Sequence, residues 1–135
     1  MRRVLRWLAF LVAFLLSLGA ALYALSESAE VVILHSRDAS GVARSTHLWV
    51  VDDAGVAWLR SGGRERGWFA HLAANPEVEL ERGGDTRAYT AVVVDTAEAA
   101  SRVSEKMREK YGWIDALIER LEGGWDPIAV RLEPR

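Results

Sequence analysis

The feature that most constrains this chain is an uncharged apolar run near its N-terminus. From Trp7 to Leu25, nineteen consecutive residues carry no charge, and most are Leu, Ala, Phe or Val. As a helix, a run of this length spans a bilayer hydrocarbon core of about 30 Å. Three arginines precede the run, and Glu27 and Glu30 follow it. The positive-inside rule therefore predicts a single-pass anchor with its N-terminus in the cytoplasm and the remaining residues outside it.

A cleavable signal peptide is the alternative interpretation of this segment. Basic residues, an apolar core and small residues such as Ala20 and Ala21 also suit export and removal. We favour a retained anchor, because the run exceeds the roughly 7–15 residues of a usual signal core. The sequence therefore predicts a transmembrane anchor at 1–28, with membrane lipid as its partner, and one domain at 29–135.

Composition excludes several classes of function for the domain. The chain has no cysteine, which excludes disulfides, thiolate metal sites and a cysteine nucleophile. Three of its 17 basic residues and one of its 19 acidic residues precede residue 29, which leaves 14 and 18 in the domain. This balance provides no broad basic surface for nucleic acid. His35, His47 and His71 lack the spacing of a helical zinc pair, so we predict no metal site.

Short alternating or β-branched runs predict six strands in the domain. They cover residues 31–34, 46–51, 56–59, 77–81, 87–94 and 128–132. A short helix that contains Trp68 precedes Asn75–Pro76, and a longer amphipathic helix follows Asp95. Six antiparallel strands with few open edges favour a closed or nearly closed barrel, and an open α+β sandwich is the alternative.

The long amphipathic stretch predicts part of the core. Apolar residues recur at steps of three and four up to the Gly123–Gly124 pair, and Gly112 is a candidate interruption. We expect the apolar face of this stretch to pack against the strands. The residues expected to be buried are Trp49, Val51, Val93, Val103, Met107, Ile114 and Leu117.

One loop concentrates positive charge beside a glycine-rich bend. Arg60, Arg64 and Arg66 surround Gly62–Gly63, immediately before the helix that contains Trp68. Guanidinium groups and the backbone N–H groups of a helix start can hold a phosphate, while a Trp offers a flat face to an aromatic ring. The alternative is a solvated loop with a buried Trp68, and the residues by themselves favour that alternative.

The motifs around this loop resemble a known family. An Arg44-Ser45-Thr46 strand entry and a hydrophobic hairpin precede the stretch Gly67-Trp68-Phe69-x-x-Leu72-x-Ala74-Asn75-Pro76-x-Val78. This order resembles the deazaflavin-dependent nitroreductase and quinone reductase family of the FMN-binding split-barrel superfamily. The resemblance covers most of residues 31–132. It implies a mainly β fold, a six-stranded antiparallel split barrel of the pyridoxamine-phosphate-oxidase-like type.

The resemblance also implies a cofactor, an acceptor and a site. The deazaflavin coenzyme or FMN would lie in a groove beside the barrel and pass a hydride to a quinone-like or nitroaromatic acceptor. A homodimer is left open, and no catalytic residue is identified. The residues that match the family's cofactor groove are Arg44, Thr46, Arg60, Ser61, Arg64, Arg66 and Trp68.

Two hypotheses of function follow. The first is a membrane-anchored flavin- or deazaflavin-dependent oxidoreductase that acts on a quinone-like or nitroaromatic acceptor. The second is a non-catalytic envelope module that uses the same barrel to bind a ligand such as haem, or a partner. Two departures from the family pattern favour the second: Gly67 stands where a Lys is common, and His71 where an Asn is common. The fold does not decide, because one barrel supports unrelated activities.

Overall fold

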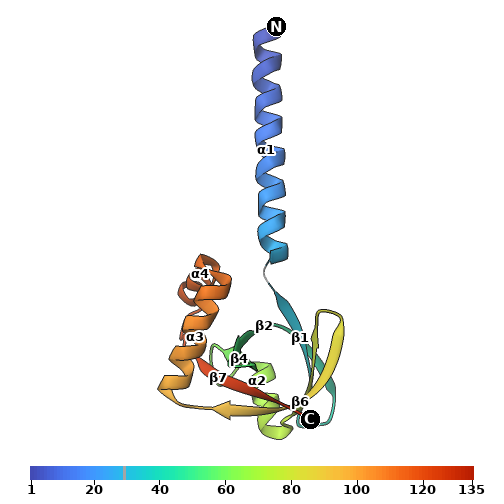
Figure 1. Cartoon of the computed structure of the whole chain (residues 1–135), viewed down its shortest axis with the longest axis vertical. Coiled ribbons are helices and arrows are strands. Elements are labelled where there is room, and N and C mark those ends of the chain that lie inside the picture. Colours follow the sequence, from blue (N-terminus) through green and yellow to red (C-terminus); the bar gives the residue numbers. More distant parts are fainter. Residues whose placement is uncertain (29) are drawn as a thin grey trace. The chain divides into compact units, whose positions relative to one another are not determined.

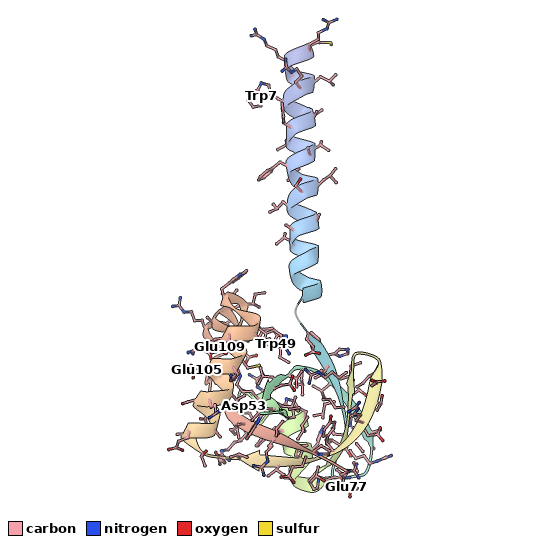
Figure 2. The ribbon with its side chains drawn as sticks, in the orientation of Figure 1. Trp7, Trp49, Asp53, Glu77, Glu105 and Glu109 are labelled. Carbon is pink, nitrogen blue, oxygen red and sulfur yellow. The ribbon has the colours of Figure 1, made fainter. Side chains whose placement is uncertain are left out.

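The computed structural model describes residues 1–28 and 30–135, and the side chains of 1–22 and 30–135. The chain forms two compact units, Met1–Glu30 and Val31–Arg135. The first contains the helix α1 (Arg2–Ser28), whose described side chains project outward and are exposed (Figure 2). By length and composition, Arg2–Leu22 is apolar enough to cross a membrane. A signal sequence has the same properties, so this helix does not distinguish the two interpretations.

The second unit is built on one curled antiparallel sheet (Figure 1). In the described residues the sheet has seven strands in the order β2-β1-β5-β6-β7-β4-β3. Every neighbouring pair in this order is antiparallel. The strands are β1 (Val31–Arg37), β2 (Ala43–Trp49), β3 (Val51–Asp53), β4 (Val56–Ser61), β5 (Glu77–Arg82), β6 (Asp85–Val94) and β7 (Ile128–Pro134).

The seventh strand arises because the run predicted as one strand at 46–51 divides at Val50. β2 ends at Trp49 and β3 begins at Val51, so Val50 lies between them and outside both ladders. Two side chains of the C-terminal half replace the missing ladder bonds. The Val50 N–H donates to Tyr111 Oη at 3.2 Å, and Lys110 Nζ donates to the Val50 carbonyl at 2.8 Å. A buried backbone group needs such a partner, so the break is a stable feature of the fold.

The core lies between the curled sheet and a short helix. Alternate residues of the strands point inward, for example Val32 and Leu34 on β1. The helix α2 (Gly67–Ala74) packs against β1 and adds Trp68 and Leu72 to the same cluster. It ends at Ala74, and its C-cap residue Asn75 directly precedes a proline, as the sequence predicts.

Two helices stand together at one end of the sheet (Figure 1). The first, α3 (Ala97–Tyr111), begins after Thr96, whose hydroxyl accepts a hydrogen bond from the Ala99 N–H at 3.2 Å. The second, α4 (Trp113–Leu121), follows directly. Gly112 separates them at φ 66° and ψ −141°, a backbone conformation that favours glycine. The long apolar stretch therefore forms two helices that are separated at Gly112.

The break at Gly112 decides which predicted core residues are buried. Val51, Val103 and Met107 are buried as expected, and Trp49 and Ile114 are half-buried. The prediction for Leu117 is wrong, because its side chain is 43% exposed. The continuous helix assumed in that prediction does not exist, and α4 presents a different face to the sheet. Val93 is also exposed, at 41%, on the outer side of β6.

The buried and the exposed positions predict different losses of stability when the side chain is truncated to alanine. Met107→Ala should lower the free energy of unfolding by about 2–5 kcal/mol, because it removes a buried side chain and leaves a cavity. The matched control Leu117→Ala should change that free energy by no more than about 0.5 kcal/mol. Denaturant unfolding of the detergent-solubilised chain, followed by Trp fluorescence, measures both. Equal losses in the two variants would contradict the packing of α3 and α4 described above.

Candidate functional site

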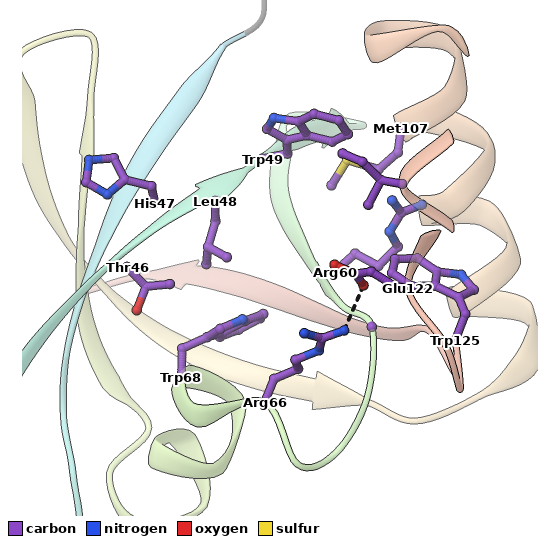
Figure 3. A pocket seen from close by; sticks show the side chains of 12 residues that line it. Thr46, His47, Leu48, Trp49, Arg60, Arg66, Trp68, Met107, Glu122 and Trp125 are labelled. Carbon is purple, nitrogen blue, oxygen red and sulfur yellow. Dashed lines mark hydrogen bonds and ion pairs between the residues drawn. The ribbon is translucent and has the colours of Figure 1, made fainter. Parts of the chain in front are cut away.

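A cavity of about 340 Å³ lies where the two ends of the curled sheet meet (Figure 3). β2, at one end of the strand order, and β4, next to the strand at the other end, both contribute to its wall. The volume is at the lower end of the range for small-molecule sites, about 300–1,000 Å³. The lining residues are Thr46, His47, Leu48, Trp49, Arg60, Gly62, Arg66, Trp68, Met107, Ile118, Glu122 and Trp125.

Three indole rings give the cavity its aromatic character. Trp49 stacks on Tyr111 of α3, with ring centroids 4.1 Å apart and an angle of 6° between the planes. Trp68 is held in the core cluster at the start of α2. Trp125 comes from the loop after α4 and lies under the guanidinium of Arg60, 4.9 Å from its ring centroid. Large rings held by packing suit the binding of a flat, partly apolar ligand.

Arg60 is part of a buried ion-pair cluster that joins β4 to α4. Its side chain is 4% exposed and pairs with Asp115, which is fully buried. Glu119 lies 3.6 Å away as a second carboxylate. A buried guanidinium is tolerated only with such partners, and losing one of them is costly. Arg60 therefore borders the cavity mainly as a structural residue.

Arg66 is the accessible cation of the cavity. Its side chain is 42% exposed, and Nη2 lies 2.7 Å from Oε2 of Glu122, the contact drawn as a dashed line in Figure 3. Arg66 also occupies the N-cap position of α2, where the described structure shows no side-chain cap. The first N–H groups of a helix and a nearby guanidinium both attract anions. An anionic group could bind here if Glu122 moved away.

Close packing joins the glycine-rich bend to the loop after α4. A Cβ atom at Gly62 would lie 2.6 Å from the Trp125 ring, closer than atoms can approach. The Asp126 N–H donates to the Gly62 carbonyl at 3.0 Å. Ser61 is buried, and its hydroxyl donates to the Gly63 carbonyl at 2.6 Å. This bend therefore shapes the cavity wall and is not open to a phosphate at Ser61.

The structure brings together four of the seven residues predicted for the cofactor groove. Thr46, Arg60, Arg66 and Trp68 line the cavity, whereas Arg44, Ser61 and Arg64 do not. The exposed Arg44 pairs with Asp38 at 3.1 Å. Arg64 pairs with Asp95, which raises the pKa of the guanidinium. Trp58 of β4 does not line the cavity and lies against Arg131. A role of the seven residues in holding a cofactor stays a prediction.

Sequence reasoning missed the residues that the C-terminal segment adds to the cavity. Met107, Ile118, Glu122 and Trp125 come from α3, α4 and the following loop. A signal was present, because Asp115, Glu119 and Glu122 recur at helical spacing and can meet an arginine-rich loop. Among the described residues, no group of three His, Asp or Glu side chains is placed to hold a metal ion.

Comparisons with known proteins give one family match. The sequence model of the family described as F420H(2)-dependent quinone reductase matches residues 12–117. This range starts within α1 and ends within α4, so it includes β1 to β6 and most of the cavity wall. A search of curated proteins finds no significant match.

Solved structures share the fold of the chain at low sequence identity. An F420-H2 dependent reductase superposes with a TM-score of 0.59 at 22% identity, over 76% of this chain and 93% of that one. A putative pyridoxamine 5'-phosphate oxidase from Listeria innocua gives 0.59 at 16%, over 87% and 94%. HutZ, the heme storage protein from Vibrio cholerae, gives 0.61 at 19%, over 86% and 89%. The curled sheet is thus the predicted mainly β split barrel of the pyridoxamine-phosphate-oxidase-like type.

The buried ion pair predicts a large effect of one substitution. Asp115→Ala should lower the free energy of unfolding by about 3 kcal/mol or more, because it leaves the Arg60 guanidinium buried with only a distant partner. The control Glu133→Gln, which loses an exposed pair with Arg131, should cost less than about 1 kcal/mol. The double variant Arg60→Met with Asp115→Leu should recover much of the loss. If Asp115→Ala unfolded like the wild type in denaturant titrations, this pair would not be holding α4.

Proposed function

This chain belongs to the F420H(2)-dependent quinone reductase family, and we propose that it is a membrane-anchored oxidoreductase that uses the deazaflavin coenzyme F420 to reduce a quinone-like acceptor. The observation that carries the proposal is the cavity, which combines indole rings with one accessible guanidinium. A flat redox coenzyme with an anionic tail needs both features. The family match supports F420 as the cofactor, whereas FMN has no such support.

The residues of the cavity fit such a coenzyme. Trp49 and Trp68 offer apolar edges to a planar ring, and the Thr46 hydroxyl is available as a hydrogen-bond donor or acceptor. Arg66, together with the uncapped start of α2, would hold the phosphate of the tail. Arg60 contributes less directly, because Asp115 already neutralises it.

The protein's part in the reaction is to bind the coenzyme, to orient it against the acceptor and to exclude water from both. When bound, reduced F420 supplies the hydride that the acceptor receives. Leu48, Met107 and Ile118 give the cavity apolar walls, which exclude water from the ring and the acceptor. His71 and Tyr89, whose side chains could supply a proton, do not line the cavity. No side chain is therefore assigned as a proton donor.

The coenzyme is expected to bind with measurable affinity, and Arg66 should contribute to it. A charge-assisted hydrogen bond to phosphate contributes about 1.5–3 kcal/mol, so Arg66→Ala should weaken F420 binding by about ten-fold or more. The matched control Arg131→Ala removes a guanidinium that does not line the cavity and should leave affinity unchanged. Quenching of Trp fluorescence in the solubilised chain measures binding, since three Trp line the cavity. If F420 does not bind below millimolar concentration, the oxidoreductase proposal fails.

Glu122 should weaken F420 binding, because its carboxylate pairs with Arg66 at the position where the phosphate of the coenzyme would bind. Glu122→Gln removes this competitor from a partly exposed pair, so F420 should bind about two- to five-fold more tightly. The control Glu133→Gln removes a carboxylate from the Arg131 pair and should have no effect on the same titration. Weaker binding of F420 to Glu122→Gln would show that the phosphate lies elsewhere.

A second candidate function is a non-catalytic module that binds haem or a similar ligand. Its support is that the three arginines predicted to hold phosphate all have carboxylate partners in the described structure. His47 lines the cavity and has an imidazole of the type that ligates haem iron. HutZ, described as a heme storage protein, shares the fold. Haem titration followed by its absorption band tests this candidate, and haem binding without F420 binding would favour it.

The proposal includes a membrane anchor at residues 1–28, with its N-terminus in the cytoplasm. The anchor and its orientation rest on the exposed apolar helix Arg2–Leu22 and the arginines at its start. The mature chain should therefore keep residues 1–28, resist extraction by alkaline carbonate and be released by detergent. N-terminal sequencing of the purified protein checks this. A soluble product that begins between Ala20 and Glu30 would show a cleaved signal peptide.

A further inference from the structure

The helix α4 has its apolar residues on the outside. Three large apolar side chains at steps of four are exposed: Trp113 at 69%, Leu117 at 43% and Leu121 at 75%. Ala116 and Arg120 complete the same exposed face. A helix on a water-soluble domain normally turns this kind of face inward.

The inner face of α4 carries the acidic residues instead. Asp115 is fully buried against Arg60, and Glu119 pairs with Arg108 at 2.9 Å while also approaching Arg60. Rotating α4 to bury Leu117 and Leu121 would expose Asp115 and leave the Arg60 guanidinium without its partner. That loss is larger than the gain from burying two leucines partly. The ion pairs therefore fix the apolar face outward.

We infer that this exposed face of α4 docks on the surface of a lipid bilayer. In the described structure Arg120 is the one charged residue among the five that form this face. Trp is enriched at the membrane–water interface, and exposed Leu side chains enter the boundary between headgroups and acyl chains. Arg120 can reach anionic headgroups while its stem stays in the apolar layer.

The length of the chain before the domain supports a bilayer as the occupant. Eight residues, 23–30, separate the candidate span Arg2–Leu22 from the start of β1 at Val31. Fully extended, eight residues reach at most about 29 Å. If α1 is the anchor, as the proposed function states, the domain stays within about this distance of the membrane. A weak apolar contact by α4 then forms at a high effective concentration of lipid.

This docking would decide which acceptors the site takes. Ile118 of α4 lines the cavity, and Glu122 and Trp125 follow the helix and line it as well. A bilayer-docked α4 therefore brings one wall of the cavity next to the acyl chains. The acceptor class would be quinones with long apolar tails, which are dissolved in the lipid and enter from that side. This step rests on the proposed function.

The absence of cysteine makes site-specific labelling direct. Single variants Leu117→Cys and Leu121→Cys carry a nitroxide in the full chain reconstituted into vesicles that contain anionic lipid. Asp85→Cys, at the exposed first residue of β6, is the aqueous control, and Ala13→Cys reports on α1. Accessibility to oxygen, relative to a water-soluble nickel complex, measures immersion. The two α4 labels should show a ratio several-fold above the Asp85 label, and below the Ala13 label.

The outcomes separate this inference from the proposed function. Aqueous α4 labels combined with a lipid-exposed Ala13 label would overturn the docking and leave the anchored enzyme standing. An aqueous Ala13 label would overturn both the anchor and the docking. Spin–spin broadening at Leu121 that vanishes on dilution with unlabelled chain would show that a second copy covers the face, and would also overturn the docking.

A kinetic comparison tests the consequence for acceptors. Leu121→Glu places a carboxylate on the docking face, at a residue that does not line the cavity. Reduction of a long-tailed quinone in vesicles should fall several-fold, while reduction of a short-tailed, water-soluble quinone and the affinity for F420 stay unchanged. An equal fall with both quinones, or no fall with either, would overturn the lipid-side entry. A wild-type chain that does not bind F420 would instead count against the proposed function.

Discussion

The fold depends on a constraint at one residue, Val50. β2 and β3 are consecutive in the chain but lie at opposite ends of the strand order, with only Val50 between them. The sheet must therefore curl until its ends meet. Hydrogen bonds from Lys110 and Tyr111 of α3 hold the Val50 backbone at this point, and Tyr111 also stacks on Trp49. The cavity lies along the resulting seam, so the closure of the barrel and the position of the site have the same cause.

Local sequence patterns correctly predicted the strands and helix ends that are determined by residues close to them in the chain. The β-branched run at 31–34 located β1, which continues to Arg37, and alternation located β5. The proline after α2 predicted the end of that helix. The division at Val50 was not predictable in this way, because its hydrogen-bond partners lie sixty residues further along the chain. The prediction that Leu117 of α4 is buried was wrong for a related reason. Periodicity favours burial of Leu117, but an Arg60 guanidinium left buried and unpaired costs about 3–5 kcal/mol, which exceeds the roughly 1.5–3 kcal/mol from burying a leucine.

The same reasoning explains what could be predicted about the site. The arginine-rich bend and Trp68 were identified from the sequence, and Thr46, Arg60 and Arg66 do line the cavity. The electrostatic state of Arg60, Arg64 and Arg66 was not predictable, because the carboxylates that pair with these arginines are 31 to 56 residues away. Two arginines that are six residues apart in the chain therefore have different electrostatic surroundings. Arg60 is buried and compensated, whereas Arg66 is exposed and held by a carboxylate that can move.

One ion pair connects the interior of the cavity to the outer surface of the domain. Asp115 neutralises Arg60 in the cavity wall and, by the same contact, turns Trp113 and Leu121 outward. A soluble protein gains nothing from that arrangement, because a solvated apolar stripe invites aggregation. An enzyme that takes a water-soluble coenzyme and a lipid-dissolved acceptor does gain from it. Under the proposed function, Arg66 serves the charged coenzyme, and α4 carries the wall of the cavity to the lipid that holds the second substrate.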